Sequence, residues 1–486
     1  MKKTFLLLLI LLFAVNIYAQ SNVQNEYNEW KPSQDEYQNF DISKYTTPDI
    51  VRNQLDINFY FHSNFHSDNS HVNYSLFGDM AGKYESSSFT GNILSSFSHY
   101  INTRKKISSL VGNLSLEGDY SSKKQKYTYP DLTTTDNKLS NNKLGLSLYL
   151  SWSNKWYFST LFFLNYGIDG NISYNSTQNK IENPLENRDE KQKEFSLNIS
   201  PQLGVGYGRI ENVQDARQAV YIANALSKKK VLTRNLSNDE LSELSQIIST
   251  VKNKRFLDSR LHLMEEITSL DTFFVNNNLL ADNGASYFTT LYDMWQYGEL
   301  FSRKSGYEIS FVVRPYYEYK KIKYTPIMRD VIYNSDEHII SLNFSYEKPF
   351  KLNWQHSVSA AVFGDFYSSS EENKQTDNNY KNSTKYRSFA ALANYSLGYY
   401  PNTRTNIRIR ASQQISKEID DDENSSTYYY AMLDAGLYYY FSPNLRLTGN
   451  CGLMYSPSRD KGNEGSYFNR DVFSSSVYIQ LTYFIF

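Results

Sequence analysis

A mainly-β fold is predicted for this chain: a transmembrane antiparallel β-barrel of about 14 strands, within a range of about 12 to 16, with an inserted small α-helical domain. Apolar and polar residues alternate with a period of two over most of the sequence, which is the periodicity of β-strands. Tight turns alternate with long polar stretches. Residues 212–302 follow a helical period instead, so they are expected to form the insertion.

The composition excludes several classes of protein. With 50 Lys+Arg against 51 Asp+Glu the formal net charge is -1, so neither a general polyanion-binding surface nor a nucleic-acid partner is expected. The mean hydropathy of -0.58 argues against a bundle of transmembrane helices. Cys451 is the single cysteine, which excludes a disulfide framework and a multi-cysteine metal site. The 43 Tyr and 29 Phe exceed what a soluble core needs, so the aromatic side chains require another explanation.

The N-terminus predicts export. Lys2 and Lys3 precede an apolar stretch over residues 5–15, and Ala19 supplies a small residue for cleavage. Residues 1–19 are therefore expected to be a signal peptide, with an N-terminal anchor helix as the alternative. Residues 20–53 are expected to form a polar periplasmic segment.

Two stretches of alternating sequence, 54–208 and 304–486, are expected to form the two parts of the barrel. The clearest example places leucines and a tryptophan on one parity and small or polar residues on the other: Leu144, Leu146, Leu148, Leu150 and Trp152 against Gly145, Ser147, Tyr149 and Ser151. A soluble sandwich is the alternative, because it would bury the same apolar parity against a second sheet.

The connections favour the barrel. Tight turns are expected at 153–155, 348–351, 401–404 and 442–444. Long polar loops are expected at 122–142, 169–192, 321–336, 368–385, 416–426 and 458–471. Aromatic residues such as Trp156, Tyr399 and Tyr440 lie next to these connections, where amphipathic rings would sit at a membrane interface.

The insertion is expected over residues 209–303 and on the rim that carries the tight turns. Its second helix has a capping box, because Glu240 follows Ser237 by three residues. The apolar stripes are wide enough to bury one another in a small bundle. By the pattern of loop lengths, the strand before the insertion runs toward the periplasm, so we expect the insertion to hang there. Since a short-turn rim does not need so large a connection, we expect the insertion to dock a periplasmic protein or the cell wall. Its lysines, including Lys228, Lys229 and Lys230, either serve that contact or form a solvated face.

The architecture and the terminal Phe486 resemble the outer-membrane β-barrels of Gram-negative bacteria, with a Tyr- and Asn-rich style similar to Bacteroidetes-type proteins. The resemblance covers most of the mature chain. It implies a location in the cell outer membrane, contact with outer-membrane lipid, and an assembly signal, Phe484 and Phe486, that the barrel assembly machinery reads. These two phenylalanines share the parity of Gln480 and Thr482 rather than that of the continuous apolar face.

Charged residues on the inward parity suggest a water-filled lumen. The expected lumen-facing charges are Arg314, Arg408, Arg410, Asp434 and Arg446. The last four lie on three consecutive strands, so they are expected to form one cluster. A passive channel or transport component for small polar solutes is the function that this pattern favours.

Two alternatives stay open. In the first, the barrel is a non-conducting structural or assembly anchor that presents the helical domain to a partner. In the second, the protein is a rim hydrolase that uses His62, His66 or His71 as bases. No catalytic motif, cofactor motif or Cys/His metal spacing occurs in the sequence, so we expect no enzyme, no cofactor and no metal site.

Overall fold

A computed structural model describes most of the chain. The described residues are 37, 40–74, 78–128, 134–183, 187–254, 259–297, 303–326, 328–375, 378–402, 404–442, 445–462 and 466–483. The expected signal peptide and the expected assembly signal at Phe484 and Phe486 lie outside these residues.

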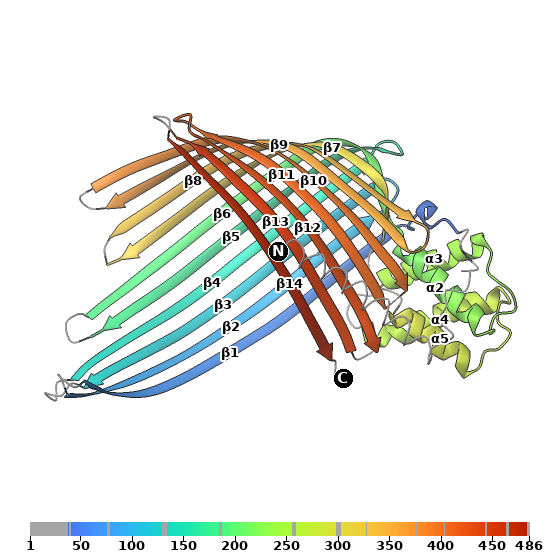
Figure 1. The fold of residues 1–486 in the computed structure, drawn as a ribbon, viewed down its shortest axis with the longest axis horizontal. Coiled ribbons are helices and arrows are strands. Elements are labelled where there is room, and N and C mark those ends of the chain that lie inside the picture. The colour runs from blue at the N-terminus through green and yellow to red at the C-terminus, as the bar shows by residue number, and fades with distance from the viewer. Residues whose placement is uncertain are drawn as a thin grey trace, which may run out of the picture.

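The described residues form one 14-stranded antiparallel sheet in which each strand pairs with its neighbours in sequence, from β1 to β14. This confirms the mainly-β class and the strand count (Figure 1). The strands are β1 (Ile50–Tyr74), β2 (Gly78–Asn102), β3 (Lys106–Thr128), β4 (Thr134–Tyr157), β5 (Phe162–Glu182), β6 (Asn187–Asn212), β7 (Lys304–Thr325), β8 (Arg329–Phe350), β9 (Trp354–Gln375), β10 (Asn378–Asn402), β11 (Thr405–Asp420), β12 (Ser425–Ser442), β13 (Leu445–Lys461) and β14 (Tyr467–Tyr483). The first strand begins at Ile50, inside the expected N-terminal segment 20–53.

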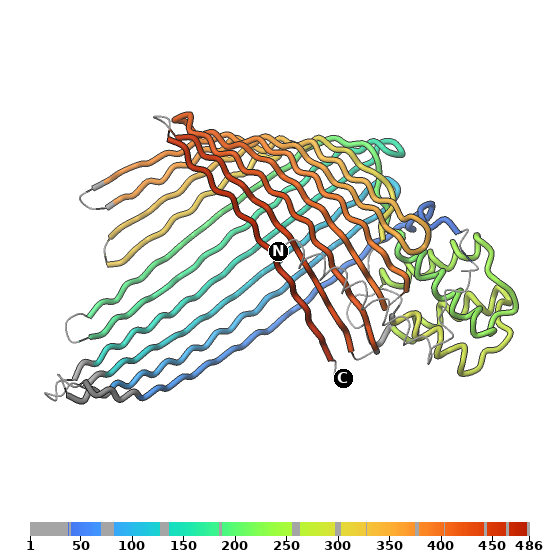
Figure 2. The backbone as a smooth tube through the Cα atoms, in the orientation of Figure 1, coloured from blue at the N-terminus to red at the C-terminus, as the bar shows by residue number. Residues whose placement is uncertain are grey.

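The sheet curves strongly, and β14 crosses over β1 in the view of Figure 2. In the described part of the chain, β1 pairs with β2 alone and β14 with β13 alone. The architecture is therefore the curved wall of a barrel with a seam between β1 and β14. Both seam strands have apolar residues on the outer parity, such as Phe59 on β1 and Ile479 on β14, which are 65% and 68% exposed.

The period of two in the sequence separates the two faces of this sheet. On β4 the leucine parity faces outward and is exposed although it is apolar, because no second layer covers it. The expected soluble-sandwich alternative is wrong for this reason, since such a sheet would bury that parity. Exposed apolar residues of the outer parity occur on strands around the wall: Leu55, Ile57, Phe61, Leu114, Leu116, Leu144, Leu146, Leu148, Leu203, Val205, Phe311, Leu342, Val362, Ile409, Leu433, Val477 and Leu481.

The prediction of long polar loops is wrong. Those stretches extend the strands, and the described ladders continue far along the hairpins, for example from Lys320–Tyr333 to Tyr324–Arg329 between β7 and β8. Polar side chains on both parities hide the strand period in these extensions, because a strand that leaves an apolar layer has water on both sides. The stretches therefore form tall hairpins on the rim opposite the insertion (Figure 1).

The insertion between β6 and β7 confirms the predicted helical domain. Its described helices are α2 (Gln214–Lys228), α3 (Asn238–Asn253), α4 (Ser259–Asn276) and α5 (Ala285–Tyr297). The expected capping box is present: the Ser237 hydroxyl accepts from the Glu240 amide, and the Glu240 carboxylate accepts from the Ser237 amide at 2.7 Å. The helices bury one shared core, with Leu226, Leu244, Phe274, Tyr287 and Leu291 among its members. No helix among the described residues is long and apolar enough to cross a membrane.

The N-terminal segment packs on the insertion before β1 begins. A short 3-10 helix, η1 (Ile42–Lys44), starts after Asp41, whose carboxylate accepts from the Ser43 amide. Ile42 and Tyr45 are buried with Val213 and Ala216 of the insertion. This contact joins the N-terminal segment to the helical insertion, although the two were expected to be separate segments.

Candidate functional site

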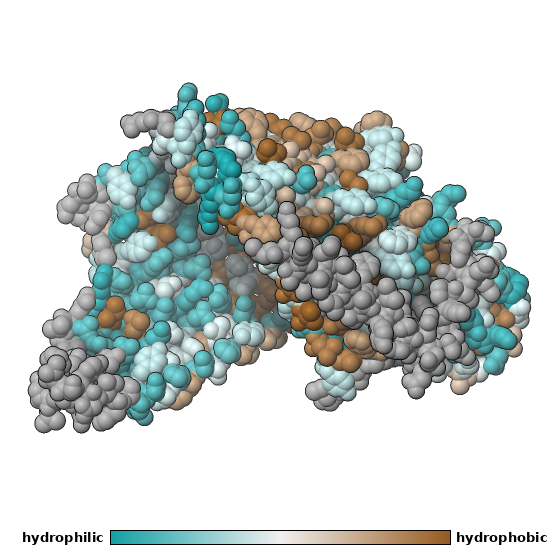
Figure 3. Space-filling view, viewed as in Figure 1, coloured by the Kyte–Doolittle hydropathy of each residue, from teal (hydrophilic) through white to brown (hydrophobic). Residues whose placement is uncertain are grey.

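The inner face of the sheet is a lattice of short polar side chains. Cross-strand hydrogen bonds join them, including Ser96 Oγ to Asn113 Oδ1 at 2.5 Å between β2 and β3. Ser151 Oγ likewise donates to Asp169 Oδ1 at 2.5 Å between β4 and β5. Figure 3 shows mainly hydrophilic residues on the wall of the hollow and hydrophobic residues on the outer surface above it. Small side chains leave the hollow open, and their hydroxyl and amide groups keep it wettable.

The expected lumen cluster is partly assembled. Arg410 on β11 lies directly opposite Asp434 on β12, and Arg410 Nε is 2.7 Å from Asp434 Oδ1. Arg408 is opposite Gly436 in the next inward position of the same ladder and is exposed. Asp434 therefore neutralises one arginine of this pair and leaves the other facing the hollow.

Arg446 and Arg314 occupy different surroundings. The Arg446 guanidinium lies 5.2 Å from the centroid of the Tyr438 ring and donates to the Tyr438 hydroxyl at 3.4 Å, so its nearest partners are aromatic. Arg314 is on the inward parity of β7, opposite Ile339, and is exposed. Because β7 and β11 are separated by β8, β9 and β10 in the sheet, Arg314 is not a member of the Arg410 cluster.

A denser group of side chains lies on the inner face of the sheet near the insertion. Lys155 on β4 reaches Glu308 on β7, with Nζ 2.5 and 2.7 Å from its two carboxylate oxygens. The lysine passes 5.3 Å from the centroid of the Phe163 ring, which is fully buried. Phe163 in turn lies over Gly206, where an added Cβ would be 2.2 Å from Phe163 Cζ. Gly206 therefore leaves room for the Phe163 ring. Lys155 passes this ring as it extends across β5 and β6 to Glu308.

A second network ties the N-terminal segment to this rim. Thr47 Oγ1 donates to Glu211 Oε2 at 2.9 Å and accepts from Asn102 Nδ2 at 3.0 Å. Arg209 binds the same glutamate at 2.7 Å and Asn102 Oδ1 at 2.7 Å. The residues come from the N-terminal segment, from β2 and from β6, so they hold strand ends that are distant in the sheet order. This network was not among the expectations from the sequence, although Arg209 and Glu211 share one parity at the polar end of β6.

The insertion is bound to the strand ends through buried arginines. Arg303, which precedes β7, donates to Gln355 Oε1 at 3.0 Å and to the Leu352 carbonyl at 2.8 Å. Its guanidinium lies 5.1 Å from the Tyr400 ring centroid, and Arg217 of α2 lies 5.1 Å from the same centroid. Burial, and then the nearby charge of Arg217, lower the pKa of Arg303 to about 9. The only sign of this contact in the sequence is the position of Arg303 at the end of the helical insertion.

The histidines proposed for rim hydrolysis have aromatic neighbours. His62 stacks on Tyr60 with centroids 6.4 Å apart, and His66 lies 6.0 Å from Tyr84. The side chain of His71 lies outside the described set. Among the described residues, no group of three His, Cys, Asp or Glu side chains is arranged to hold a metal ion.

Comparisons with known proteins give likenesses to solved structures alone. A scan with protein-family models gives no match, and a search of curated proteins gives none either. The chain is similar to the β domain of the Bordetella autotransporter BrkA, with a TM-score of 0.23 and 8% identity over 72% of this chain and 96% of that chain. It is similar to the transport unit of the autotransporter AIDA-I from Escherichia coli, with a TM-score of 0.20 and 9% identity over 92% and 93%. It is also similar to the CymD monoaromatic hydrocarbon channel, with a TM-score of 0.25 and 8% identity over 93% and 94%.

Proposed function

We propose that this chain is an outer-membrane β-barrel protein that acts as a channel or transport component for small polar solutes. The observation that carries the proposal is the separation of the two faces of one uncovered sheet. The outer parity is apolar and exposed, with Leu203 59% and Leu481 62% exposed. Water would penalise so large an apolar surface, whereas a bilayer solvates it. The insertion and the tight turns then face the periplasm.

The inner face supports passage of polar solutes. Hydroxyl, amide and charged groups replace part of the hydration shell of a solute at low cost. Arg408 is an exposed cation beside the Arg410–Asp434 ion pair. The electric field at this point of the wall therefore depends on whether Asp434 neutralises Arg410. A channel with such a wall discriminates by size and charge rather than by a fitted pocket.

Planar-bilayer recording of the purified full-length chain tests this proposal. We expect discrete conductance steps in salt solution. Asp434→Asn should shift the cation-to-anion permeability ratio toward anions by about twofold to fivefold, because it releases the charge of Arg410 into the lumen. Asp421→Asn, at the tip of the β11–β12 hairpin, is the matched control and should change the ratio little. Insertion into the bilayer without any conductance would contradict the channel.

A second candidate, a non-conducting anchor for the helical domain, is favoured by the rim contacts. Ser305 Oγ at the start of β7 donates to the Ser43 carbonyl at 3.1 Å, while Ile50 begins β1 on a distant part of the wall. The intervening segment therefore crosses the mouth, with Thr47 bonded on the way. Retention of a periplasmic protein or cell-wall fragment by the full chain, without conductance, would support the anchor.

A further inference from the structure

Lysines gather on the outer face of β6 and β7 just beyond the apolar band. Lys193 and Lys323 lie directly opposite each other in the ladder, and Lys191 is opposite Thr325 in the next outward position. All three lysines are exposed. Two like charges in directly opposed positions repel each other, so this arrangement is unfavourable without a counter-charge.

The nearby carboxylates are engaged with other lysines. Asp330 lies directly opposite Lys323 in the β7–β8 ladder, but its Oδ2 lies 3.3 Å from Lys321 Nζ and so is shared with that lysine. Asp189 Oδ2 lies 4.0 Å from Lys180 Nζ. No ion pair within the described residues involves Lys191, Lys193 or Lys323. The patch formed by these three side chains, which we call the β6–β7 lysine patch, is thus a local excess of positive charge.

The position of the patch along the strands is that of a membrane interface. Phe195, two residues before Leu197 on β6, packs against Tyr319 of β7 with ring centroids 6.3 Å apart. Below these rings the outer parity continues as Leu197, Ile199 and Leu203. An aromatic row between an apolar band and lysines is the order expected at the headgroup level of a bilayer.

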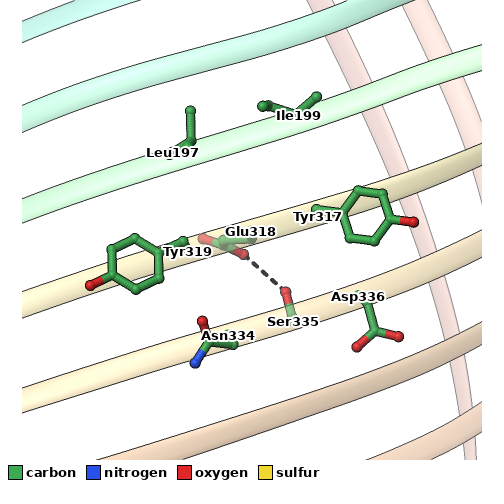
Figure 4. A pocket seen from close by; sticks show the side chains of 8 residues that line it. All are labelled: Leu197, Ile199, Tyr317, Glu318, Tyr319, Asn334, Ser335 and Asp336. Atoms are coloured by element: carbon green, nitrogen blue, oxygen red, sulfur yellow. Dashed lines mark hydrogen bonds between the residues drawn. The ribbon is translucent and has the colours of Figure 1, made fainter.

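A shallow depression lies further along the same strands, toward the apolar band. It has a volume of about 370 Å³ and lies over β6, β7 and β8. Leu197 and Ile199 form its apolar side, and the tyrosine rings of Tyr317 and Tyr319 flank it (Figure 4). At its far side Asp336 lies 3.8 Å from His338 Nε2, away from the lysine side of Tyr319. The depression therefore lies within the apolar band at Leu197 and Ile199, and the patch begins four residues further along each strand, from Leu197 to Lys193 on β6 and from Tyr319 to Lys323 on β7.

We propose that the β6–β7 lysine patch binds an anionic lipid, one whose headgroup phosphates give it a net negative charge, with an acyl chain along the depression. The proposal rests on the embedding of the barrel in a membrane. Phosphate oxygens accept from several ammonium groups at once and remove the repulsion between Lys193 and Lys323. The apolar side of the depression favours a lipid over a free anion, because Leu197 and Ile199 can stabilise an acyl chain but not an inorganic anion.

Native mass spectrometry of the full chain in detergent tests the proposal, with lipid A that carries two phosphates as the probe. The variant combines Lys191→Gln, Lys193→Gln and Lys323→Gln. The matched control combines Lys105→Gln, Lys229→Gln and Lys254→Gln, which removes the same charge from exposed positions on the opposite rim. We expect the patch variant to bind lipid A at least about tenfold more weakly than the wild type, and the control to bind as the wild type does.

Three results would overturn the proposal. Equal losses in the patch variant and the control would show a general effect of net charge. Equal binding of zwitterionic phosphatidylethanolamine would show that phosphate charge is not recognised. Displacement of lipid A by millimolar inorganic phosphate would show a free-anion site. Conductance of the patch variant reports separately on the channel, so failure of one idea is distinguishable from failure of the other.

Discussion

The Arg303 guanidinium lies 5.1 Å from the centroid of the Tyr400 ring, and the Arg303 side chain is fully buried. This contact joins the end of the helical insertion to the end of β10. Arg303 also binds Gln355 and two backbone carbonyls, so it satisfies groups on the β8–β9 connection. The insertion is therefore a fixed part of the rim rather than a tethered domain.

Arg303→Gln should release the insertion from the rim. Loss of a buried, multiply bonded arginine costs about 3 kcal/mol, because its partners stay buried without a donor. Limited proteolysis of the detergent-solubilised chain should free the insertion faster than in the wild type. Arg234→Gln is the control, since this exposed arginine pairs with Glu240 on the surface and its loss costs about 1 kcal/mol or less. Equal proteolysis of the two variants would contradict the role of Arg303.

The capping box should make helix α3 sensitive to acid. The Arg234 guanidinium, bonded to Glu240 at 2.7 Å, and the Ser237 hydrogen bonds together lower the pKa of this carboxyl from 4.5 to about 2. A carboxyl with a depressed folded pKa contributes stability above its unfolded pKa and loses it as the pH falls toward the folded value. Hydrogen exchange of α3 amides, corrected for intrinsic rates, should therefore quicken between pH 4.5 and about 2.

Glu240→Gln should remove most of that pH dependence and cost about 1 kcal/mol of α3 stability at neutral pH. Glu243→Gln, an exposed glutamate on the same helix, is the matched control and should behave as the wild type. An acid response that survives in Glu240→Gln would assign the effect to another group.

Gly206 should be intolerant of a side chain. An alanine Cβ there would meet the Phe163 ring at 2.2 Å, and overpacking of this kind costs about 1–3 kcal/mol. Urea unfolding in lipid vesicles should detect the loss. The double variant Gly206→Ala with Phe163→Leu should recover part of it. Gly118→Ala is the control, because an added Cβ at Gly118 has no neighbour within 4 Å.

The seam between β1 and β14 should close in a membrane. Unpaired amides and carbonyls along both edges are costly in lipid, and pairing the edges satisfies them. In a Cys451→Ser background, Ile57→Cys should form a disulfide with one of Val477→Cys, Ile479→Cys or Leu481→Cys on the same outer parity. Tyr478→Cys, on the inner parity, should not cross-link. Absence of every cross-link in membranes would show that the sheet stays open.

The strands and the helices were predictable because their signals are local. The alternation at Leu144–Trp152 requires one face of a strand to meet an apolar medium, whatever the rest of the chain does. The capping box at Ser237 and Glu240 likewise lies within one helical turn. The hairpin extensions were missed because polar residues on both parities remove the local period.

The sequence by itself determined the class of the sheet, the residue range of the insertion and the parity of charged residues such as Arg408, Arg410 and Asp434 that lie in alternating segments, because periodicity along one segment decides these features. Only the tertiary structure decided which charges meet. Asp434 pairs with Arg410 and not with Arg446, Lys155 reaches Glu308 across two strands, and Arg303 is buried against Tyr400. Such partners depend on ladder register and on contacts between distant segments, and neither is encoded in the period of a single strand.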